Sequence, residues 1–324
     1  MSPESRWPGA AELGRLGYGA ASIGNLYREV ADADADAALS AAWAGGIRYY
    51  DTAPHYGLGL SERRLGEFLR SRPRDEFIVS TKVGRVLEPN PDYAGGDDLA
   101  FEYAVPNRLV RRFDPSEAGV RRSLEDSLER LGLDRIDIAY LHDPDVYDLD
   151  RGLAEGLPAL AKLRDEGVVG AIGIGTNSAD AAARAVREGD LDLVMIAGRY
   201  TLLEQPALAE LLPLCEARGV GVVAAAVFNS GLLATASPQA DARYDYATVP
   251  HEMLARARRL AEACAAEGVE LPVAAIQYPL RHPAVRSVVV GSARATSVEQ
   301  NLARIAEPLP ESFWTSLAEQ GLLP

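Results

Sequence analysis

The sequence predicts a (β/α)8 barrel, and three observations lead to that prediction. Short apolar runs alternate with longer Ala-, Leu-, Arg- and Glu-rich segments along all 324 residues. Eight such runs occur, and each is almost continuously apolar, as expected of strands covered on both faces. No charge run or low-complexity tract divides the chain, so we expect residues 1–324 to form a single domain. The main alternative is an open doubly wound sheet, which normally has fewer strands and a switch point in their order.

The expected strands are short runs rich in Val, Ile, Leu and aromatic residues. They lie at residues 14–20, 47–51, 77–83, 136–142, 169–175, 191–197, 219–227 and 285–291.

Between these runs the apolar residues recur with helical spacing. Several of the helical segments begin near Asp or Ser and end at Gly, which are residues that cap helix ends. The clearest helices are expected at residues 35–46, 61–72, 116–132 and 252–268. The longest stretch that we expect to be irregular runs from about Gly84 to Pro115. Loops of that length in compact domains are usually functional or mobile.

The composition limits the class of partner and the cellular setting. Lys plus Arg total 33 against 47 Asp plus Glu, a formal net charge of −14, so neither a nucleic acid nor an anionic membrane is expected as a partner. Cys215 and Cys264 are too few for a disulfide framework. Residues 1–15 lack the apolar stretch of a secretory signal, and no window reaches the roughly 18 apolar residues of a membrane span. We therefore expect a soluble, cytoplasmic protein.

Ionisable residues fall where several of the expected strands end. Asp51 ends the second run, Lys82 lies near the end of the third, and His142 ends the fourth. Tyr56 follows Asp51 by five residues, in the loop above the same strand. Each residue alone has an ordinary structural explanation, such as a turn cap or a loop aromatic. Barrel active sites lie at the C-terminal ends of the strands, so their shared location favours an active site there.

The four side chains also suit one kind of chemistry. A tyrosine hydroxyl has an ordinary pKa of about 10 and is a poor acid or base near neutrality. A nearby ammonium favours the phenolate, and a carboxylate keeps the lysine charged and oriented. A neutral histidine can donate a hydrogen bond to a substrate oxygen. The set predicts reversible proton transfer at a carbinol or carbonyl oxygen, without the nucleophile of an acyl-transfer site.

Metal and Rossmann-type sites are not expected. His251 and His282 stand far apart in the sequence without carboxylates at metal-ligand spacing. The segment "GYGAASIG" contains Gly17, Gly19 and Gly24, whose spacing differs from that of the dinucleotide-binding fingerprint.

Several motifs together resemble the aldo-keto reductases. They are "LGYGAASIGN", "YYDTAPHYGLGLSERRLGEFL", "VSTKVGR", "DSLERLGLDRIDIAYLHDPD" and "SVVVGSARATSVEQNL", in the family's order along almost the whole chain. The core pattern D-T-A-x-x-Y-G-x-x-x-S-E-x-x-L-G is highly specific. The resemblance implies a (β/α)8 barrel that binds NADPH or NADH in an extended form across its C-terminal rim, without a Rossmann domain.

The resemblance also assigns roles to the four rim residues. Tyr56 matches the family's general acid/base, and Lys82 matches the lysine that tunes it. Asp51 matches the supporting carboxylate, and His142 the histidine that orients and polarises the substrate oxygen. Asn177 matches the asparagine that binds the nicotinamide carboxamide.

Further cofactor contacts follow from two glycine-containing segments that match the family. The segment "GSARATSVEQN" matches the one that holds the adenosine end. The expected contacts from these two segments are Gly19, Gly291, Ser292, Arg294 and Asn301.

Some positions depart from the family pattern. Ala197 stands where many members carry Gln, and Ala225 stands where an aromatic often stacks on nicotinamide, for which Phe228 offers a substitute surface. Near the adenosine end, a common acid becomes Gln300 and a common arginine becomes Ser297. These changes leave fewer positive groups for a 2′-phosphate, so both NAD and NADP remain open.

The loops "AGRYTLL", "VFNSGLL" and "FEYAVPNRLVRRFD" look most like the family's aldose dehydrogenase branch, which includes L-fucose, D-threo-aldose and galactose dehydrogenases. That branch oxidises the anomeric carbon of a free sugar to a lactone. His55, Phe113, Tyr147 and Phe228 are the expected substrate-wall residues.

Other functions stay open beside sugar oxidation. They are a pyridoxal dehydrogenase, a generic aldehyde or ketone reductase, and a cofactor-sensing binding subunit without catalysis. A hydrolase would need paired carboxylates or metal ligands at the strand ends, which the sequence does not offer. The expected partner is a small sugar or aldehyde, bound by a monomer or small homo-oligomer.

Overall fold

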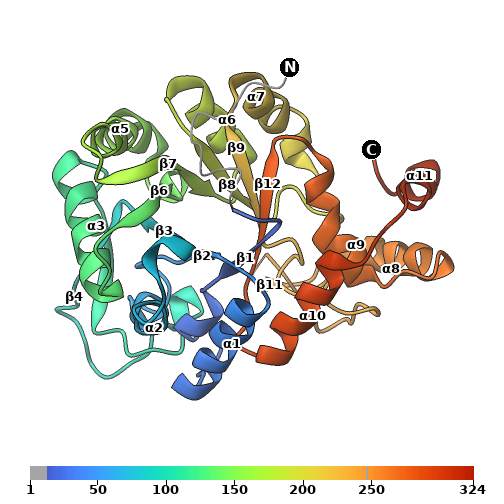
Figure 1. Ribbon diagram of the computed structural model, residues 1–324, viewed down its shortest axis with the longest axis horizontal. Coiled ribbons are helices and arrows are strands. Elements are labelled where there is room, and N and C mark those ends of the chain that lie inside the picture. Colours follow the sequence, from blue (N-terminus) through green and yellow to red (C-terminus); the bar gives the residue numbers. More distant parts are fainter. Residues whose placement is uncertain (1–12, 246) are drawn as a thin grey trace.

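The computed structural model describes residues 13–245 and 247–324, and its centre is a closed barrel of parallel strands (Figure 1). The strand order is β1-β12-β9-β8-β7-β6-β3-β2, and every neighbouring pair is parallel. The barrel strands are β1 (Leu16–Gly19), β2 (Tyr49–Asp51), β3 (Ile78–Val83), β6 (Ile136–His142), β7 (Val169–Thr176), β8 (Leu193–Ala197), β9 (Gly221–Ala225) and β12 (Val285–Val290). The predicted (β/α)8 barrel is confirmed.

Helices surround the barrel as an outer layer, with α11 at its edge (Figure 1). Ser116 caps the start of α3, where its hydroxyl accepts a hydrogen bond from the Gly119 N–H, and Gly132 ends the helix in the left-handed conformation. The α-helices are α1 (Asp32–Ala44), α2 (Leu60–Leu69), α3 (Glu117–Leu131), α4 (Leu149–Arg151), α5 (Leu157–Asp165), α6 (Ala179–Glu188), α7 (Leu211–Arg218), α8 (His251–Ala266), α9 (Leu271–Gln277), α10 (Ala295–Ala306) and α11 (Glu311–Glu319).

Short helical turns lie in the connections between these elements. The 3-10 turns are η2 (Ser22–Gly24), η3 (Arg74–Glu76), η4 (Leu99–Phe101), η5 (Pro144–Val146), η7 (Pro206–Leu208) and η8 (Tyr278–Arg281), and η6 (Gly152–Gly156) is a π-turn.

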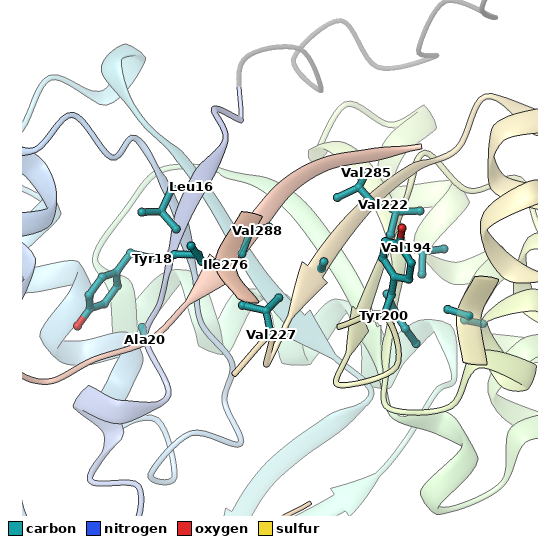
Figure 2. Close-up of a cluster of buried hydrophobic side chains, with 14 of the residues drawn as sticks. Leu16, Tyr18, Ala20, Val194, Tyr200, Val222, Val227, Ile276, Val285 and Val288 are labelled. Atoms are coloured by element: carbon teal, nitrogen blue, oxygen red, sulfur yellow. The ribbon is translucent and has the colours of Figure 1, made fainter. Parts of the chain in front are cut away.

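One layer of the core lies between the strands and the helices. Figure 2 shows part of it, with Leu16 and Tyr18 on β1, Val288 on β12, and Ile276 from α9. Successive strand residues alternate between this layer and the barrel interior. On β1 the interior position is Gly17, where a Cβ would lie 2.6 Å from the Tyr49 ring. The glycine therefore leaves room for an interior aromatic side chain.

A second core layer fills the barrel itself, so the barrel is packed and not a pore. The interior cluster is Leu13, Tyr49, Ile138, Tyr140, Ala171, Leu193, Met195, Val223 and Val289. It forms a floor beneath the C-terminal ends of the strands.

The stretch between Gly84 and Pro115 corrects an expectation. It is not irregular throughout, because β4 (Arg85–Pro89) and β5 (Leu109–Phe113) pair as an antiparallel hairpin above the barrel. The two strands are joined by residues 90–108, which are too long for the two-residue turn that marks a hairpin in a sequence. A smaller hairpin of β10 (Arg243–Tyr244) and β11 (Ala247–Thr248) follows β9.

Cys215 on α7 and Cys264 on α8 are free and buried, and burial raises the pKa of each thiol to about 12. Within the described parts of the chain, none of the helices has both the length and the apolar character needed to cross a bilayer. Most of the N-terminal stretch without a signal pattern lies outside the described residues, which begin at Leu13.

Candidate active site

A cavity of about 570 Å³ opens at the C-terminal ends of the barrel strands, a size typical of small-molecule sites. Residues of both hairpin excursions help to line it. The expected site residues that line the cavity are Gly19, Asp51, His55, Tyr56, Lys82, His142, Tyr147, Asn177, Phe228 and Gly291.

A buried ion pair joins two neighbouring strands at the bottom of the cavity. Lys82 Nζ on β3 lies 2.6 Å from Asp51 Oδ2 on β2 and donates a further hydrogen bond of 3.0 Å to the Thr52 carbonyl. Both charged side chains are almost completely buried. The pair forms because both residues occupy interior positions near the ends of adjacent parallel strands.

A chain of hydroxyl groups supports the Asp51 carboxylate from inside the barrel. Ser80 Oγ donates to Asp51 Oδ1 at 2.7 Å, Tyr49 OH lies 3.0 Å from Ser80 Oγ, and Tyr140 OH lies 3.3 Å from Tyr49 OH. Burial raises the pKa of both tyrosines, so they stay neutral. These residues were not predicted from the sequence, although Ser80 lies two positions before Lys82 on β3 and therefore points to the same side of the strand.

Tyr56 lies in the loop after β2, above the ion pair. Lys82 Nζ is 4.7 Å from the centre of the tyrosine ring, and the His142 ring is 6.1 Å away at 90°. Gly57, which follows, has φ of +61°, and a Cβ there would collide with the Gly24 carbonyl oxygen. Only glycine fits both the backbone conformation and the close approach.

The remaining polar residues of the D-T-A-x-x-Y-G-x-x-x-S-E pattern tie helix α2 to the barrel. Ser61 Oγ lies 2.8 Å from Thr52 Oγ1. Glu62 is completely buried and accepts hydrogen bonds from Thr81 Oγ1 at 2.8 Å and from Arg130 Nε at 2.6 Å. These contacts hold helices α2 and α3 against the strands that carry the Asp51–Lys82 ion pair. Thr52, Ser61 and Glu62 therefore have a structural role in the motif.

Two histidines face each other beside Tyr56. The rings of His55 and His142 are 5.5 Å apart and nearly perpendicular. Burial lowers the pKa of each histidine well below its ordinary value, and the positive charge of Arg85 lowers both further. Both imidazoles are therefore neutral near pH 7. Within the described chain, the Nδ1 atoms of both rings have no hydrogen-bond partner.

An ion pair that the sequence reading did not identify lies beside His142. Arg85 is 4% exposed and its guanidinium donates to Asp143 Oδ2, which lies 3.4 Å from His142 Nε2. The guanidinium also lies 5.2 Å from the centre of the Tyr147 ring. Phe113 stacks on Tyr147 at 4.9 Å between ring centres and does not itself line the cavity.

The β4–β5 excursion supplies an aromatic wall. The rings of Phe101 and Tyr103 each lie 5.5 Å from the His55 ring. Arg111 makes two hydrogen bonds to the Asp98 carboxylate and a third, of 2.8 Å, to the His55 carbonyl. The excursion is thus bonded to the loop that carries Tyr56. Phe101 and Tyr103 lie in the loop "FEYAVPNRLVRRFD", but neither was predicted as a wall residue, because their position depends on the fold of a long connection.

The expected cofactor residues fall into two groups. Gly19 and Gly291 cross closely in the cavity wall, where a Cβ on Gly291 would lie 2.5 Å from the Gly19 carbonyl oxygen. Asn177, directly after β7, also lines the cavity. This group leaves a surface of exposed backbone at the rim, as a close approach to an extended ligand requires.

The second cofactor group lies outside the main cavity. Ser292 and Asn301 line a separate void of about 10 Å³, which has room for about one water molecule, and Arg294 directly precedes helix α10. The Ser292 carbonyl accepts a 2.6 Å hydrogen bond from Tyr18 OH, and Asn301 Oδ1 accepts from Arg304.

Two of the positions that depart from the family pattern, Ala197 and Ala225, face the ligand space, whereas Ser297 and Gln300 lie on helix α10 outside the cavity lining. Ala197 and Ala225 line the cavity, and their small side chains leave it wider than larger residues would. The ring of Phe228 also lines the cavity, so an aromatic surface is present there. Asn229 is buried, and among the described residues its amide oxygen has no hydrogen-bond partner. Open glycine backbone, a buried amide oxygen without a partner in the described chain and a large rim cavity together fit a nicotinamide dinucleotide. Within residues 13–245 and 247–324, no group of His, Cys, Asp or Glu side chains is arranged to hold a metal ion.

A model of the Aldo/keto reductase family matches residues 15–320 of this chain. The chain belongs to the aldo-keto reductase family. It is accordingly an NAD(P)-dependent oxidoreductase, and the family resemblance seen in its motifs is confirmed.

Relatives among characterised family members cover nearly the whole chain. A D-threo-aldose 1-dehydrogenase from a Pseudomonas species is 56% identical over 98% of this chain and 98% of its own. A pyridoxal 4-dehydrogenase from Microbacterium luteolum is 41% identical over 95% of this chain and 94% of its own. An L-galactose dehydrogenase from Arabidopsis thaliana is 31% identical over 91% and 85%.

Solved aldo-keto reductase structures share the fold. The holo form of an enzyme from Bacillus halodurans superposes with a TM-score of 0.75 at 26% identity, covering 96% of this chain and 92% of that one. A glycerol dehydrogenase from Gluconobacter oxydans, at 23% identity and a TM-score of 0.72 over 100% and 96% of the two chains, supports the fold alone.

Proposed function

We propose that this aldo-keto reductase is an aldose 1-dehydrogenase that oxidises the anomeric carbon of a free sugar to the lactone. The observation that carries the proposal is the 56% identity to a D-threo-aldose 1-dehydrogenase over 98% of both chains. The arrangement of Asp51, Tyr56, Lys82 and His142 around one cavity supports it, because these groups can move a proton to and from a carbinol oxygen.

In the oxidative direction Tyr56 accepts the proton of the anomeric hydroxyl. The ammonium of Lys82, 4.7 Å from the ring centre, stabilises the phenolate that this step requires. Asp51 holds that ammonium in place through the 2.6 Å hydrogen bond. His142, neutral because burial lowers its pKa, donates a hydrogen bond that orients the reacting oxygen.

The nicotinamide cofactor, when bound, supplies the hydride acceptor. Gly19, Asn177 and Gly291 would hold it along the cavity, and the segment from Ser292 into helix α10 would hold its adenosine end. Ser292, Arg294 and Asn301 are the residues proposed there. Ser297 and Gln300 carry no positive charge, so we propose that the enzyme does not depend strictly on the 2′-phosphate of NADP.

The sugar would lie against an aromatic wall. We propose that His55, Tyr147 and Phe228 contact it directly, since they line the cavity. Phe113 would act only through Tyr147, on which it stacks. We also propose that residues 1–324 work as a single domain, in which one barrel carries the complete site.

Pyridoxal oxidation is the second candidate, favoured by the 41% identity to a pyridoxal 4-dehydrogenase. A panel of free aldoses and pyridoxal, each with NAD and with NADP, separates the candidates through the absorbance of the reduced nicotinamide. Turnover of a sugar to its lactone supports the proposal. Turnover of pyridoxal alone, or brisk reduction of simple aldehydes without any sugar oxidation, would overturn it.

A further inference from the structure

The wall of the cavity beside His142 contains a buried ion pair that the proton-transfer mechanism does not use. Arg85, the first residue of β4, and Asp143, the first residue after β6, both line the cavity. The Arg85 guanidinium donates to Asp143 Oδ2, and that oxygen lies 3.4 Å from His142 Nε2. A charged donor and a charged acceptor thus stand next to the proposed position of the reacting oxygen.

The pair is incompletely satisfied within the protein. The side chain of Arg85 is 5% exposed, yet its Nε has no partner among the described residues. Taking two charges out of water is costly unless their remaining hydrogen-bonding positions are filled. Asp143 also has φ of +39°, which residues other than glycine seldom adopt, and its N–H donates to the Gly175 carbonyl at 2.8 Å. The backbone therefore holds this carboxylate at the rim.

We propose that Arg85 and Asp143 recognise a substrate hydroxyl on the carbon next to the reacting one. This inference rests on the proposed sugar dehydrogenase function and names the group that the site selects. A hydroxyl both donates and accepts, so it can donate to the Asp143 carboxylate and accept from the Arg85 guanidinium. A neighbouring oxygen of a polyol held at His142 reaches a carboxylate only 3.4 Å from that imidazole. A plain aldehyde offers no such group and leaves the pair as it is.

A purely structural role makes a different prediction. The pair could simply fasten the β4–β5 excursion to the loop after β6. The excursion contains a second buried pair, Arg111 with Asp98, whose members do not line the cavity. Substitution there disturbs the excursion without touching the proposed hydroxyl site, so Asp98→Asn is the matched control for Asp143→Asn.

The experiment compares two aldehydes of equal carbon number. Glyceraldehyde carries a hydroxyl beside the carbonyl and propanal does not, and both are reduced with NADH or NADPH. The readout is the ratio of kcat/KM for glyceraldehyde to that for propanal. We expect Asp143→Asn and Arg85→Lys each to lower this ratio about 10- to 100-fold, the range for losing a hydrogen bond to a charged group. The ratio in Asp98→Asn should match the wild type.

Two results would overturn the proposal. One is an unchanged ratio in folded Asp143→Asn and Arg85→Lys, and the other is an equal fall in Asp98→Asn. If one of the first two variants does not fold, the other carries the comparison, and calorimetric binding of a free aldose replaces kinetics where turnover is lost. The proposed function is tested separately, because it fails if the wild type forms no lactone from any aldose, whatever the ratio shows.

Discussion

The Lys82 ammonium donates a 2.6 Å hydrogen bond to the Asp51 carboxylate inside the barrel, and neither side chain is more than 4% exposed. Separating the two side chains would leave a buried charge without its partner, which is strongly destabilising. The ammonium therefore stays beside the carboxylate. The same ammonium faces the Tyr56 ring. The Lys82 ammonium thus contacts both the Asp51 carboxylate in the barrel interior and the ring of Tyr56, the residue proposed to transfer the proton.

Substitution of Lys82 tests that link. We expect Lys82→Arg to lose most of its activity despite keeping the charge, because a planar guanidinium cannot fit as a point charge between Asp51 and the phenol. Lys82→Met should keep a residual activity whose optimum in sugar oxidation moves to higher pH, since the phenolate loses its nearest positive charge. Steady-state rates across pH provide the measurement. A normal Arg variant, or a Met variant with the wild-type pH profile, would make Lys82 a structural residue only.

The hydroxyl chain beneath Asp51 gives a second prediction. Ser80→Ala removes the 2.7 Å hydrogen bond to Asp51 Oδ1 and leaves that buried oxygen without its donor. Such a loss costs about 1–3 kcal/mol. We expect it to appear as a lower free energy of unfolding, as a lower kcat (about tenfold for each 1.4 kcal/mol), or as a combination of the two, with the cofactor dissociation constant unchanged. Tyr140→Phe, at the far end of the chain, should have a smaller effect on kcat. Equal effects of the two variants on kcat would argue against a support that weakens with distance from the carboxylate.

Gly57 offers a test of how Tyr56 is positioned. Gly57→Ala should lower the free energy of unfolding by more than the roughly 1–3 kcal/mol of an unfavourable φ, because its Cβ would also collide with the Gly24 carbonyl. Gly46→Ala is the matched control, since Gly46 has φ of +87° with nothing within 4 Å of an added Cβ. Chemical denaturation measures both. If both variants lower the free energy of unfolding equally, the close approach between Gly57 and Gly24 contributes nothing to stability.

The lowered pKa of His142 predicts a pH dependence of stability. Burial lowers this pKa well below 6.5, so in acid the unfolded chain takes up a proton that the folded chain refuses. The free energy of unfolding should therefore fall as pH drops from about 6.5, by up to ~1.4 kcal/mol per pH unit from this residue. His142→Asn should make the decline shallower between about pH 6.5 and 5. If the free energy of unfolding of His142→Asn fell with pH as steeply as that of the wild type, a lowered pKa of His142 would not be the cause of the decline.

The sequence predicted the barrel and the positions at its rim for a simple reason. Asp51, Lys82 and His142 interrupt apolar runs at their C-terminal ends, and parallel strands bring those ends to one edge. Ser80 and Tyr49 escaped notice because a serine or tyrosine inside a strand is an ordinary residue. Their function as a support for the carboxylate follows from the pairing register of two strands, which a single sequence does not display.

The parts that the sequence did not predict depend on the fold of long connections. Arg85 and Asp143 lie 58 residues apart and meet only because β4 begins a hairpin beside the loop after β6. Phe113 was expected in the substrate wall, but it lies behind Tyr147, against which it stacks. Residues 90–108 contain turn residues such as Gly95 and Gly96, but a connection of this length does not indicate from its sequence that the flanking strands pair.

The Tyr56→Phe variant tests the central claim most directly. The ring can still pack, but the hydroxyl that accepts the proton is gone, and positioned acid/base catalysis contributes about 10²–10⁴-fold. Measured on an aldose that the wild type oxidises, kcat should fall by that factor, while the cofactor dissociation constant stays close to the wild-type value. Wild-type turnover by a folded Tyr56→Phe protein would contradict the mechanism.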